Sequence, residues 1–359
     1  SSVWGQVDSI YTFFIIYSIY LLENNKNLLS FIIFSISTVI KPQSLIFTPI
    51  YLFKIYQILK INNFSLDSFK TIIKYFICSI ISIFVLLLPF AKIPNSFTLD
   101  FSYIINQYIS TIKSYPYVTI NAYNIYSIIT NLSNGWINIK DTMFLISYNS
   151  FGLICIIFIT LLSFYFLNKN KKKYTYFLVA AFLNFAIFMF SIKMHERYYF
   201  TSLILILICY IYSNNKNFLN LYLCLSATFL INSLTVMLLY MGIHINIAFI
   251  STFIGFINLI LFVYLFLLIL KNQYTFLTIK FSLFKNKYSF IIFLTLIYSI
   301  LSFVNLGNTT SVQTYWHPKK NEVATVNFSE NNIVKKIQYF TGASHDQDFE
   351  IYYSVDNVR

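Results

Sequence analysis

Long apolar segments recur along this sequence, and they limit its fold more than any other feature does. Of its residues, 58% are hydrophobic and only 10% are charged, whereas a soluble protein carries about 25% charged residues. The segments repeatedly approach the roughly 20 apolar residues that a helix needs to cross the core of a bilayer. The sequence therefore predicts an all-α polytopic membrane bundle, with about ten spans within residues 1–305.

The expected spans follow directly from these apolar segments. Two of them, 28–40 and 44–56, leave two interpretations open: a hairpin of short helices, or one element kinked at Pro42. The expected spans are 9–22, 28–40, 44–56, 75–90, 149–167, 175–192, 199–213, 218–240, 248–270 and 288–305.

The distribution of lysine predicts an orientation for the bundle. If Ser1 is outside, the inside links hold fourteen lysines, and the outside links before residue 306 hold six basic residues. Positive residues prefer the cytoplasmic side. This bias therefore places Ser1, the loop 91–148, the link at His195 and the C-terminus on the extracytoplasmic face of a cell membrane. Lysines in short links also account for much of the net charge of +13, and the basic face of a nucleic-acid-binding domain is not visible.

Two segments outside the spans are expected to carry structure of their own. The loop 91–148 contains the stretch 101–115, whose apolar residues recur at helical spacing. We expect an amphipathic helix on the membrane surface, which either covers the bundle or gates a substrate. From about Asn308 apolar and polar residues alternate, which predicts β-strands. Residues 306–359 are therefore expected to form an extracytoplasmic β segment, cut off at Arg359 before a sandwich can close.

The cysteines indicate neither a zinc site nor a disulfide framework. Cys78, Cys155, Cys209 and Cys224 all lie within apolar segments, and the sequence has no C-x-x-C motif and no Cys/His cluster. We expect them to be packing residues.

Three polar motifs lie at the ends of spans, where polar groups are costly unless they are partnered. In WGQVDS (4–9), Asp8 either supports the start of a helix or belongs to a site. In KPQSLIFTP (41–49), Lys41 either extends to the interface or belongs to the same site. In HERY (195–198), three consecutive ionisable residues cannot share one helix face. They fit a helix end or a turn, where they can converge on one ligand.

The lysine counts place all three motifs on one face of the membrane. Together they offer Lys, Arg and His side chains for a phosphate, and carboxylate or amide groups for hydroxyls. That combination suits a sugar carried on a lipid phosphate. Such a phosphate leaves readily once cations stabilise it. A nucleotide-binding motif is therefore not needed, and the sequence contains neither G-x-G-x-x-G nor a P-loop.

With these motifs in this order, the chain resembles the GT-C-fold membrane glycosyltransferases, which take a sugar from a polyprenyl-phosphate carrier. The stronger resemblance is to bacterial proteins of the dolichyl-phosphate-mannose mannosyltransferase type. A more distant one is to the glucosyltransferases that use dolichyl-phosphate-glucose. The resemblance spans residues 1 to about 305 and rests on WGQVDS (4–9), KPQSLIFTP (41–49), LLPF (87–90), NAYNIYSI (121–128) and HERY (195–198).

The resemblance implies a role for each motif. His195 and Arg197 would contact the donor phosphate, with Lys41 beside them. Asp8 would line the sugar or acceptor side. The residues expected to orient the site or to bind sugar are Glu196, Gln6, Trp4, Gln43 and Asn124.

Similar proteins carry their catalytic carboxylate in an outer loop upstream of the WGQVDS-like motif. That loop is absent here. We therefore expect a fragment that is inactive by itself, whose general base precedes residue 1 and for which Asp8 is the fallback. The expected partners are the polyprenyl-phosphate-sugar donor, a glycan, lipid or protein acceptor, and the membrane. No metal site and no cofactor is assigned, and the sequence leaves open whether a divalent metal ion assists.

Two further interpretations accompany this one. The tail 316–359 resembles the start of a discoidin-type β-sandwich, a module that often binds carbohydrate or surfaces. For the membrane part, the alternative to an enzyme is a transporter or flippase for a lipid-linked glycan, which would need the same cations. The polar residues gather at one membrane face instead of mid-membrane, which favours chemistry at the interface.

Overall fold

A computed structural model of the chain divides it into two compact units, Ser1–Lys287 and Tyr288–Arg359. The structure describes residues 7–95, 98–130, 137–143, 145–170, 172–240 and 246–271, and Thr295. The expected β segment 306–359 and, apart from Thr295, the expected span 288–305 therefore lie outside the described residues.

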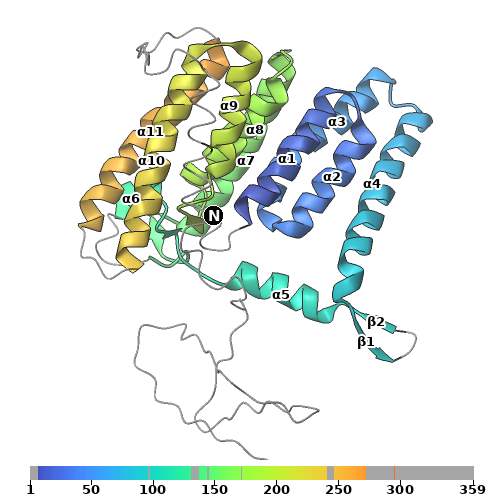
Figure 1. Cartoon of the computed structure of the whole chain (residues 1–359), viewed down its shortest axis with the longest axis horizontal. Coiled ribbons are helices and arrows are strands. Elements are labelled where there is room, and N and C mark those ends of the chain that lie inside the picture. Colours follow the sequence, from blue (N-terminus) through green and yellow to red (C-terminus); the bar gives the residue numbers. More distant parts are fainter. Residues whose placement is uncertain are drawn as a thin grey trace, which may run out of the picture. The chain divides into compact units, whose positions relative to one another are not determined.

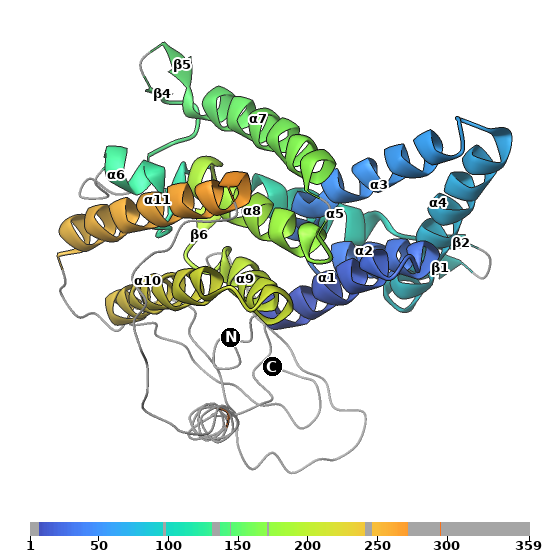
Figure 2. The same cartoon turned by 90° about the horizontal axis from the view of Figure 1, so that it is seen from above.

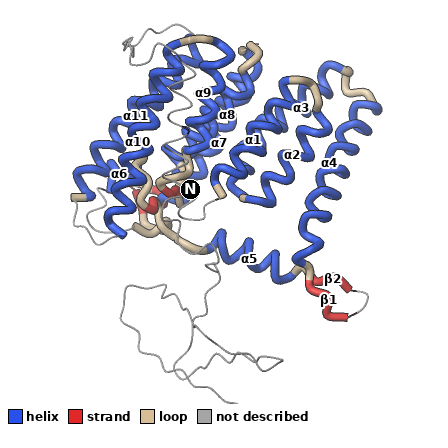
Figure 3. Tube along the Cα trace, viewed as in Figure 1, coloured by secondary structure: helices blue, strands red, loops and turns tan. Residues whose placement is uncertain are grey.

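Helices dominate the first unit (Figure 1 and Figure 3). Its α-helices are α1 (Asp8–Glu23), α2 (Asn27–Ile40), α3 (Thr48–Ile61), α4 (Leu66–Leu87), α5 (Ser102–Lys113), α6 (Ile125–Thr130), α7 (Tyr148–Lys169), α8 (Thr175–Phe190), α9 (Phe200–Ser213), α10 (Lys216–Tyr240) and α11 (Ile247–Lys271). Two 3₁₀ helices, η1 (Pro42–Phe47) and η2 (Leu88–Phe90), adjoin α3 and α4. Short strands pair as β1 (Lys92–Asn95) with β2 (Thr98–Asp100), β3 (Thr119–Ile120) with β6 (Met194–His195), and β4 (Thr142–Met143) with β5 (Ile146–Ser147).

Five of the described helices are long and apolar enough to cross a membrane. They are Pro42–Ile61, which combines η1 with α3; Leu66–Phe90, which combines α4 with η2; Tyr148–Lys169; Lys216–Leu239; and Ile247–Leu270. Helices α2, α8 and α9 are apolar but shorter. A helical bundle with the character of a membrane protein is therefore confirmed, and the count of ten crossings stays a prediction.

The chain breaks at Lys41 because a proline follows it. Proline disfavours the helical conformation of the residue before it, and Lys41 is extended, with φ −151° and ψ 115°. Pro42 then opens η1 and Pro49 lies in the first turn of α3, positions at which the missing N–H has no cost. Of the two interpretations of this region, the structure favours two separate helices, α2 and the combined η1–α3, over one kinked element.

The start of α4 differs from the expectation. It begins at Leu66 and not near residue 75, because Ser65 caps it by accepting a hydrogen bond from the Ser68 N–H at 3.3 Å. Lys70 and Lys74 therefore lie in the first turns of α4. The expected spans leave them in the link between residues 56 and 75. Hydropathy finds where a helix is apolar, and the cap decides where it begins.

Helix α8 is the most buried helix of the bundle. Apart from Tyr176 and Phe190, all of its sixteen residues are buried, as expected for a helix that is apolar on every side. It packs on α7, α9 and α11, and also on α1, α3 and η1. It thereby joins the two groups of helices seen in Figure 1 and Figure 2, α1–α4 and α7–α11.

Several helix ends that are distant in sequence meet at one end of this bundle. They are the start of α1, the ends of α2 and α8, and the start of α9 (Figure 1). The stretch 101–115 contains helix α5, as expected. This helix lies across the same end of the bundle (Figure 1). The Tyr108 hydroxyl attaches α5 to α2 by donating a hydrogen bond to the Val39 carbonyl oxygen at 2.6 Å. The contact of α5 with a membrane surface stays a prediction.

A non-helical segment, residues 118–124, runs through the interior beside this end and leads into α6. Buried backbone of this kind must find its hydrogen bonds within the protein. Gly255 of α11 lets α6 approach closely. A Cβ at this position would lie 2.8 Å from the Ser127 Oγ and 3.1 Å from the Asn124 carbonyl oxygen, so only glycine fits without a shift of α6.

Replacing Gly255 tests this close approach. Gly255→Ala should lower the free energy of unfolding by about 1–3 kcal/mol, because an added methyl group forces the backbone of α6 away from α11. Gly152→Ala is the matched control, since its Cβ would lie 3.3 Å from a side-chain carbon of Ile192, which can move slightly. The melting temperature of the detergent-solubilised protein compares the two. A wild-type melting temperature for Gly255→Ala would contradict the packing.

Candidate functional site

Five ionisable side chains from three parts of the chain converge at the shared end of the bundle. Asp8 opens α1, Lys41 joins α2 to η1, and His195, Glu196 and Arg197 connect β6 toward α9. All five are buried or partly buried. The structure thus brings together the charged residues that the sequence analysis assigned to one site.

Asp8 is the centre of this cluster. It lies in the first turn of α1, where the helix dipole favours a carboxylate, and only 4% of its side chain is exposed. Its Oδ1 accepts a hydrogen bond from the Lys41 Nζ at 2.5 Å, and its Oδ2 lies 3.6 Å from the Arg197 Nε. A buried carboxylate is costly unless it is paired, and here each oxygen faces a cation.

Lys41 is held inward, against Asp8 and two aromatic rings. Its side chain is 15% exposed. The ammonium group lies 5.1 Å from the ring centroid of Tyr11 and 4.9 Å from that of Tyr198. Aromatic faces attract a cation at such distances. Asp8 and the two rings together keep the charge of Lys41 at the site.

The link between α8 and α9 turns sharply after His195. The Tyr198 N–H donates to the His195 carbonyl oxygen at 3.1 Å, and the Phe200 N–H donates to that of Arg197 at 3.1 Å. Arg197 Nη1 donates to Glu196 Oε1 at 2.9 Å, while Glu196 Oε2 lies 3.9 Å from His195 Nδ1. The three residues do not share a helix face, as expected: His195 ends β6, and Glu196 and Arg197 lie in the turn that follows.

The cluster is balanced in charge when His195 is neutral. Lys41 and Arg197 are cations, and Asp8 and Glu196 are anions. Burial lowers the pKa of His195 to about 4, and the charges of Arg197 and Lys41 act in the same direction. At pH 7 its imidazole can therefore donate one N–H and accept at the other nitrogen. Burial also lowers the pKa of Lys41, an effect that the charge of Asp8 opposes.

Three buried polar atoms at this site lack a hydrogen-bond partner. They are Asp8 Oδ2, Arg197 Nε and Gln43 Oε1. The amide nitrogen of Gln43 donates to the Tyr198 carbonyl oxygen at 3.2 Å, which holds Gln43 beside the turn. Buried polar groups without a hydrogen bond are uncommon in folded proteins. Two of these atoms, Asp8 Oδ2 and Arg197 Nε, still face each other as an ion pair at 3.6 Å.

Not every expected residue belongs to the cluster. The fully buried side chain of Asn124 donates to the Phe188 carbonyl oxygen at 2.9 Å and accepts from the Tyr126 N–H at 3.1 Å. It anchors a loop and does not face Asp8. Trp4 and Gln6 lie outside the described residues. Among the residues that the structure describes, no group of three or more His, Cys, Asp or Glu side chains could hold a metal ion.

The sequence analysis assigned no role to Tyr11, Tyr198 or Asn184. Tyr11 follows Asp8 by three residues, so helical spacing already places both on one face. Tyr198 is the last residue of HERY. Asn184 of α8 donates to the Tyr198 carbonyl oxygen at 3.1 Å and accepts from the Ser202 N–H at 3.1 Å. Nothing in its sequence context distinguishes Asn184, because both partners lie on other elements.

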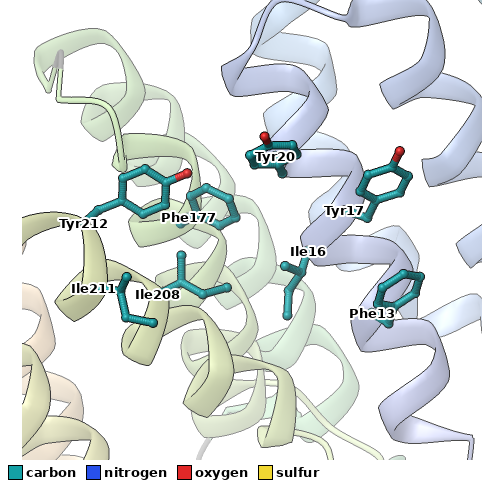
Figure 4. Close-up of a pocket in the computed structure, with 8 residues that line it drawn as sticks. All are labelled: Phe13, Ile16, Tyr17, Tyr20, Phe177, Ile208, Ile211 and Tyr212. Atoms are coloured by element: carbon teal, nitrogen blue, oxygen red, sulfur yellow. The ribbon is translucent and has the colours of Figure 1, made fainter. Parts of the chain in front are cut away.

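An apolar groove of about 260 Å³ runs between α1 and the helices α8 and α9 (Figure 4). It begins five residues beyond Asp8, which is about 7.5 Å along α1. Nearer the site, α1 and α9 touch through the hydroxyls of Thr12 and Thr201, 2.7 Å apart. The groove is lined by Phe13, Ile16, Tyr17, Tyr20, Phe177, Ile208, Ile211 and Tyr212.

No protein-family model matches this sequence, and no curated protein matches it. The function is therefore inferred from the chemistry of the cluster, the groove and the helical bundle that holds them.

The neutral state of His195 can be tested through the pH dependence of stability. Its pKa of about 4 lies below the ordinary value of 6.5. Between these values the unfolded chain binds a proton that the folded chain does not. The free energy of unfolding should therefore keep its full value above pH 6.5. It should fall as the pH drops toward 4, by up to about 3 kcal/mol from this residue.

His195→Gln should make the melting temperature fall less steeply over this pH range. Lys70→Gln, which removes an exposed charge remote from the cluster, should keep the wild-type slope. Equal slopes for the wild type and His195→Gln would show that His195 does not resist protonation.

Proposed function

We propose that this protein is an integral-membrane glycosyltransferase that transfers a hexose, such as mannose, from a polyprenyl-phosphate donor at the extracytoplasmic face. The observation that carries the proposal is the convergence of Lys41, His195 and Arg197 on buried carboxylates at one end of an apolar helical bundle. The two cations, Lys41 and Arg197, and the N–H of neutral His195 suit a phosphate diester. The carboxylate and amide oxygens that lack a hydrogen bond suit sugar hydroxyls. Such a donor reaches the site from the lipid phase.

The proposed reaction is a displacement at the anomeric carbon. An acceptor hydroxyl forms the new C–O bond while the bond from that carbon to the phosphate oxygen breaks. The bonding electrons leave with the polyprenyl monophosphate. Arg197 and Lys41 stabilise the charge that develops on it, and neutral His195 offers one N–H. The hydroxyl proton passes to a carboxylate base, for which Asp8 Oδ2 is the candidate among the described atoms.

Arg197 is the best placed of the cations to take the phosphate. Its side chain is 25% exposed, against 15% for Lys41. Its Nε is 3.6 Å from Asp8, which is too far for a good hydrogen bond. A phosphate oxygen can therefore bind Arg197 without first breaking a hydrogen bond to Asp8. Lys41, which donates directly to Asp8, supports the site as a second charge.

The groove beside α1 supports a lipid-carried donor. Its lining is aromatic and branched aliphatic, which suits a hydrocarbon chain. It lies along the same helix that carries Asp8, so one helix contributes both to the polar site and to an apolar path. A transporter or flippase for a lipid-linked glycan would use the same two features. Its polar groups would be expected near mid-membrane, whereas here the described cluster is at one end, which favours the enzyme.

Substitutions at the cluster test the phosphate role. In the full-length protein, Arg197→Ala and His195→Ala should each lower sugar transfer from polyprenyl-phosphate-mannose at least about tenfold, because a charge-assisted bond contributes roughly 1.5–3 kcal/mol. Arg197→Lys should recover only part of the rate, since lysine lacks the bidentate geometry of the guanidinium group. Transfer of radiolabelled sugar in membranes with matched protein levels measures the effect.

Lys70→Ala is the matched control for these variants. Lys70 is 77% exposed and pairs with exposed Asp67 at 3.3 Å, so its removal should leave transfer unchanged. Normal transfer by both Arg197→Ala and His195→Ala would contradict a phosphate site at these residues. It would favour the transporter over the enzyme.

The orientation of the bundle can be tested independently of activity. The four free cysteines are first replaced, and a single cysteine is then introduced at exposed Lys140 or exposed Lys70. A membrane-impermeant maleimide added outside should label Lys140→Cys, and should label Lys70→Cys only after the membrane is permeabilised. The reverse pattern would place the cluster on the cytoplasmic face and contradict an extracytoplasmic reaction.

A further inference from the structure

The backbone of His195 is held by pairing with the segment 118–123. Thr119 and Ile120 of β3 pair in parallel with Met194 and His195 of β6. The Lys193 N–H donates to the Val118 carbonyl oxygen at 2.9 Å, and Asn121 forms a further bridge to His195. The backbone position of His195 therefore depends on where this segment lies.

Two asparagines from other helices form hydrogen bonds with the backbone of the same segment. Asn232 of α10 binds it twice: its Oδ1 accepts from the Tyr123 N–H at 3.1 Å, and its Nδ2 donates to the Asn121 carbonyl oxygen at 2.8 Å. Asn258 of α11 donates from its Nδ2 to the Tyr123 carbonyl oxygen at 2.8 Å. Both asparagine side chains are buried. They therefore pair backbone groups that water cannot reach.

We propose that Asn232 and Asn258 are positioning residues for His195, which fix the segment 121–123 and, through its pairing with β6, the place of the imidazole in the site. Neither residue contacts the charged cluster through a hydrogen bond or ion pair found in the structure. They act from α10 and α11, helices that contribute none of the five ionisable residues. The role in sugar transfer rests on the function proposed above, whereas the effect on His195 itself does not.

The geometry explains why this arrangement matters for the imidazole. His195 faces Glu196, Arg197 and Lys41, and it packs on the rings of Tyr115 and Tyr198 at 5.6 and 5.0 Å between centroids. A shift of the segment would change the distances to all of these groups together. Displacement of about 1 Å is enough to lower a rate by about a hundredfold when a reacting geometry depends on it.

The decisive measurement is the titration of His195 in the full chain, followed by ¹⁵N imidazole NMR in detergent and assigned by the loss of its signal in His195→Gln. Asn232→Leu and Asn258→Leu remove the hydrogen bonds to the segment at similar side-chain size. In each, the pKa of His195 should move toward its ordinary value by at least about one pH unit, because the imidazole is less well held in its buried place. Sugar transfer should fall at least about tenfold.

Two further variants separate positioning from general destabilisation. Asn232→Asp can keep both hydrogen bonds, since a buried carboxyl group stays protonated, and it should restore the wild-type titration. Leu225→Ala makes a cavity in the same helix at a fully buried position, and it should lower the melting temperature without moving the titration. Asn258 makes one hydrogen bond to the segment, against two for Asn232, so Asn258→Leu carries the test where Asn232→Leu does not fold.

The outcomes distinguish the two proposals. An unchanged His195 titration in folded Asn232→Leu or Asn258→Leu overturns the positioning role, whatever the transfer rate. A shifted titration in a protein that transfers no sugar from the polyprenyl-phosphate donor supports the positioning role and overturns the glycosyltransferase.

Discussion

A buried charge is costly unless it is paired, and the charged end of this bundle is arranged around that constraint. Asp8 faces both Lys41 and Arg197, and Arg197 in turn donates to Glu196. These pairs connect the start of α1, the end of α2 and the link from α8 to α9. Buried pairs of this kind are weak evidence for stability, because desolvation offsets much of their attraction. Their effect here is to hold three separate parts of the chain next to one another.

The rest of the fold brings these ends to the same place. Pro42 ends α2 and leaves Lys41 at the end of the bundle instead of within a helix. Helix α8, buried on all sides, is the common neighbour of both helix groups. Asn184 of α8 holds the Tyr198 carbonyl oxygen, and Gln43 of η1 holds the same oxygen. The turn that carries His195 is thus attached to both groups, as the charged pairs are.

Local features of the sequence predicted much of this arrangement. Each expected span before residue 272 overlaps a described helix, because apolar length and proline act locally, although α4 begins earlier than expected. Asp8, Lys41 and the HERY turn could be found because a charge beside a span is conspicuous. The support behind His195 could not. Asn232 meets its partner Tyr123 at a separation of 109 residues, and an asparagine within an apolar helix has no local signature that names its partner. Asn124 was expected to orient the site or to bind sugar, and its hydrogen bond to the Phe188 carbonyl oxygen places it in the loop that supports His195.

The balanced charge of the cluster has a consequence for how a ligand arrives. With His195 neutral, two cations and two anions lie within one small volume, so their fields largely cancel at a distance. The cluster itself therefore adds little to the long-range steering of an anion through water, unlike a strongly charged cleft. Capture must then depend on encounter at contact distance, and its rate should change little with ionic strength. The proposed lipid-carried donor would meet that requirement, because a ligand confined to a bilayer diffuses in two dimensions and does not need electrostatic attraction through water.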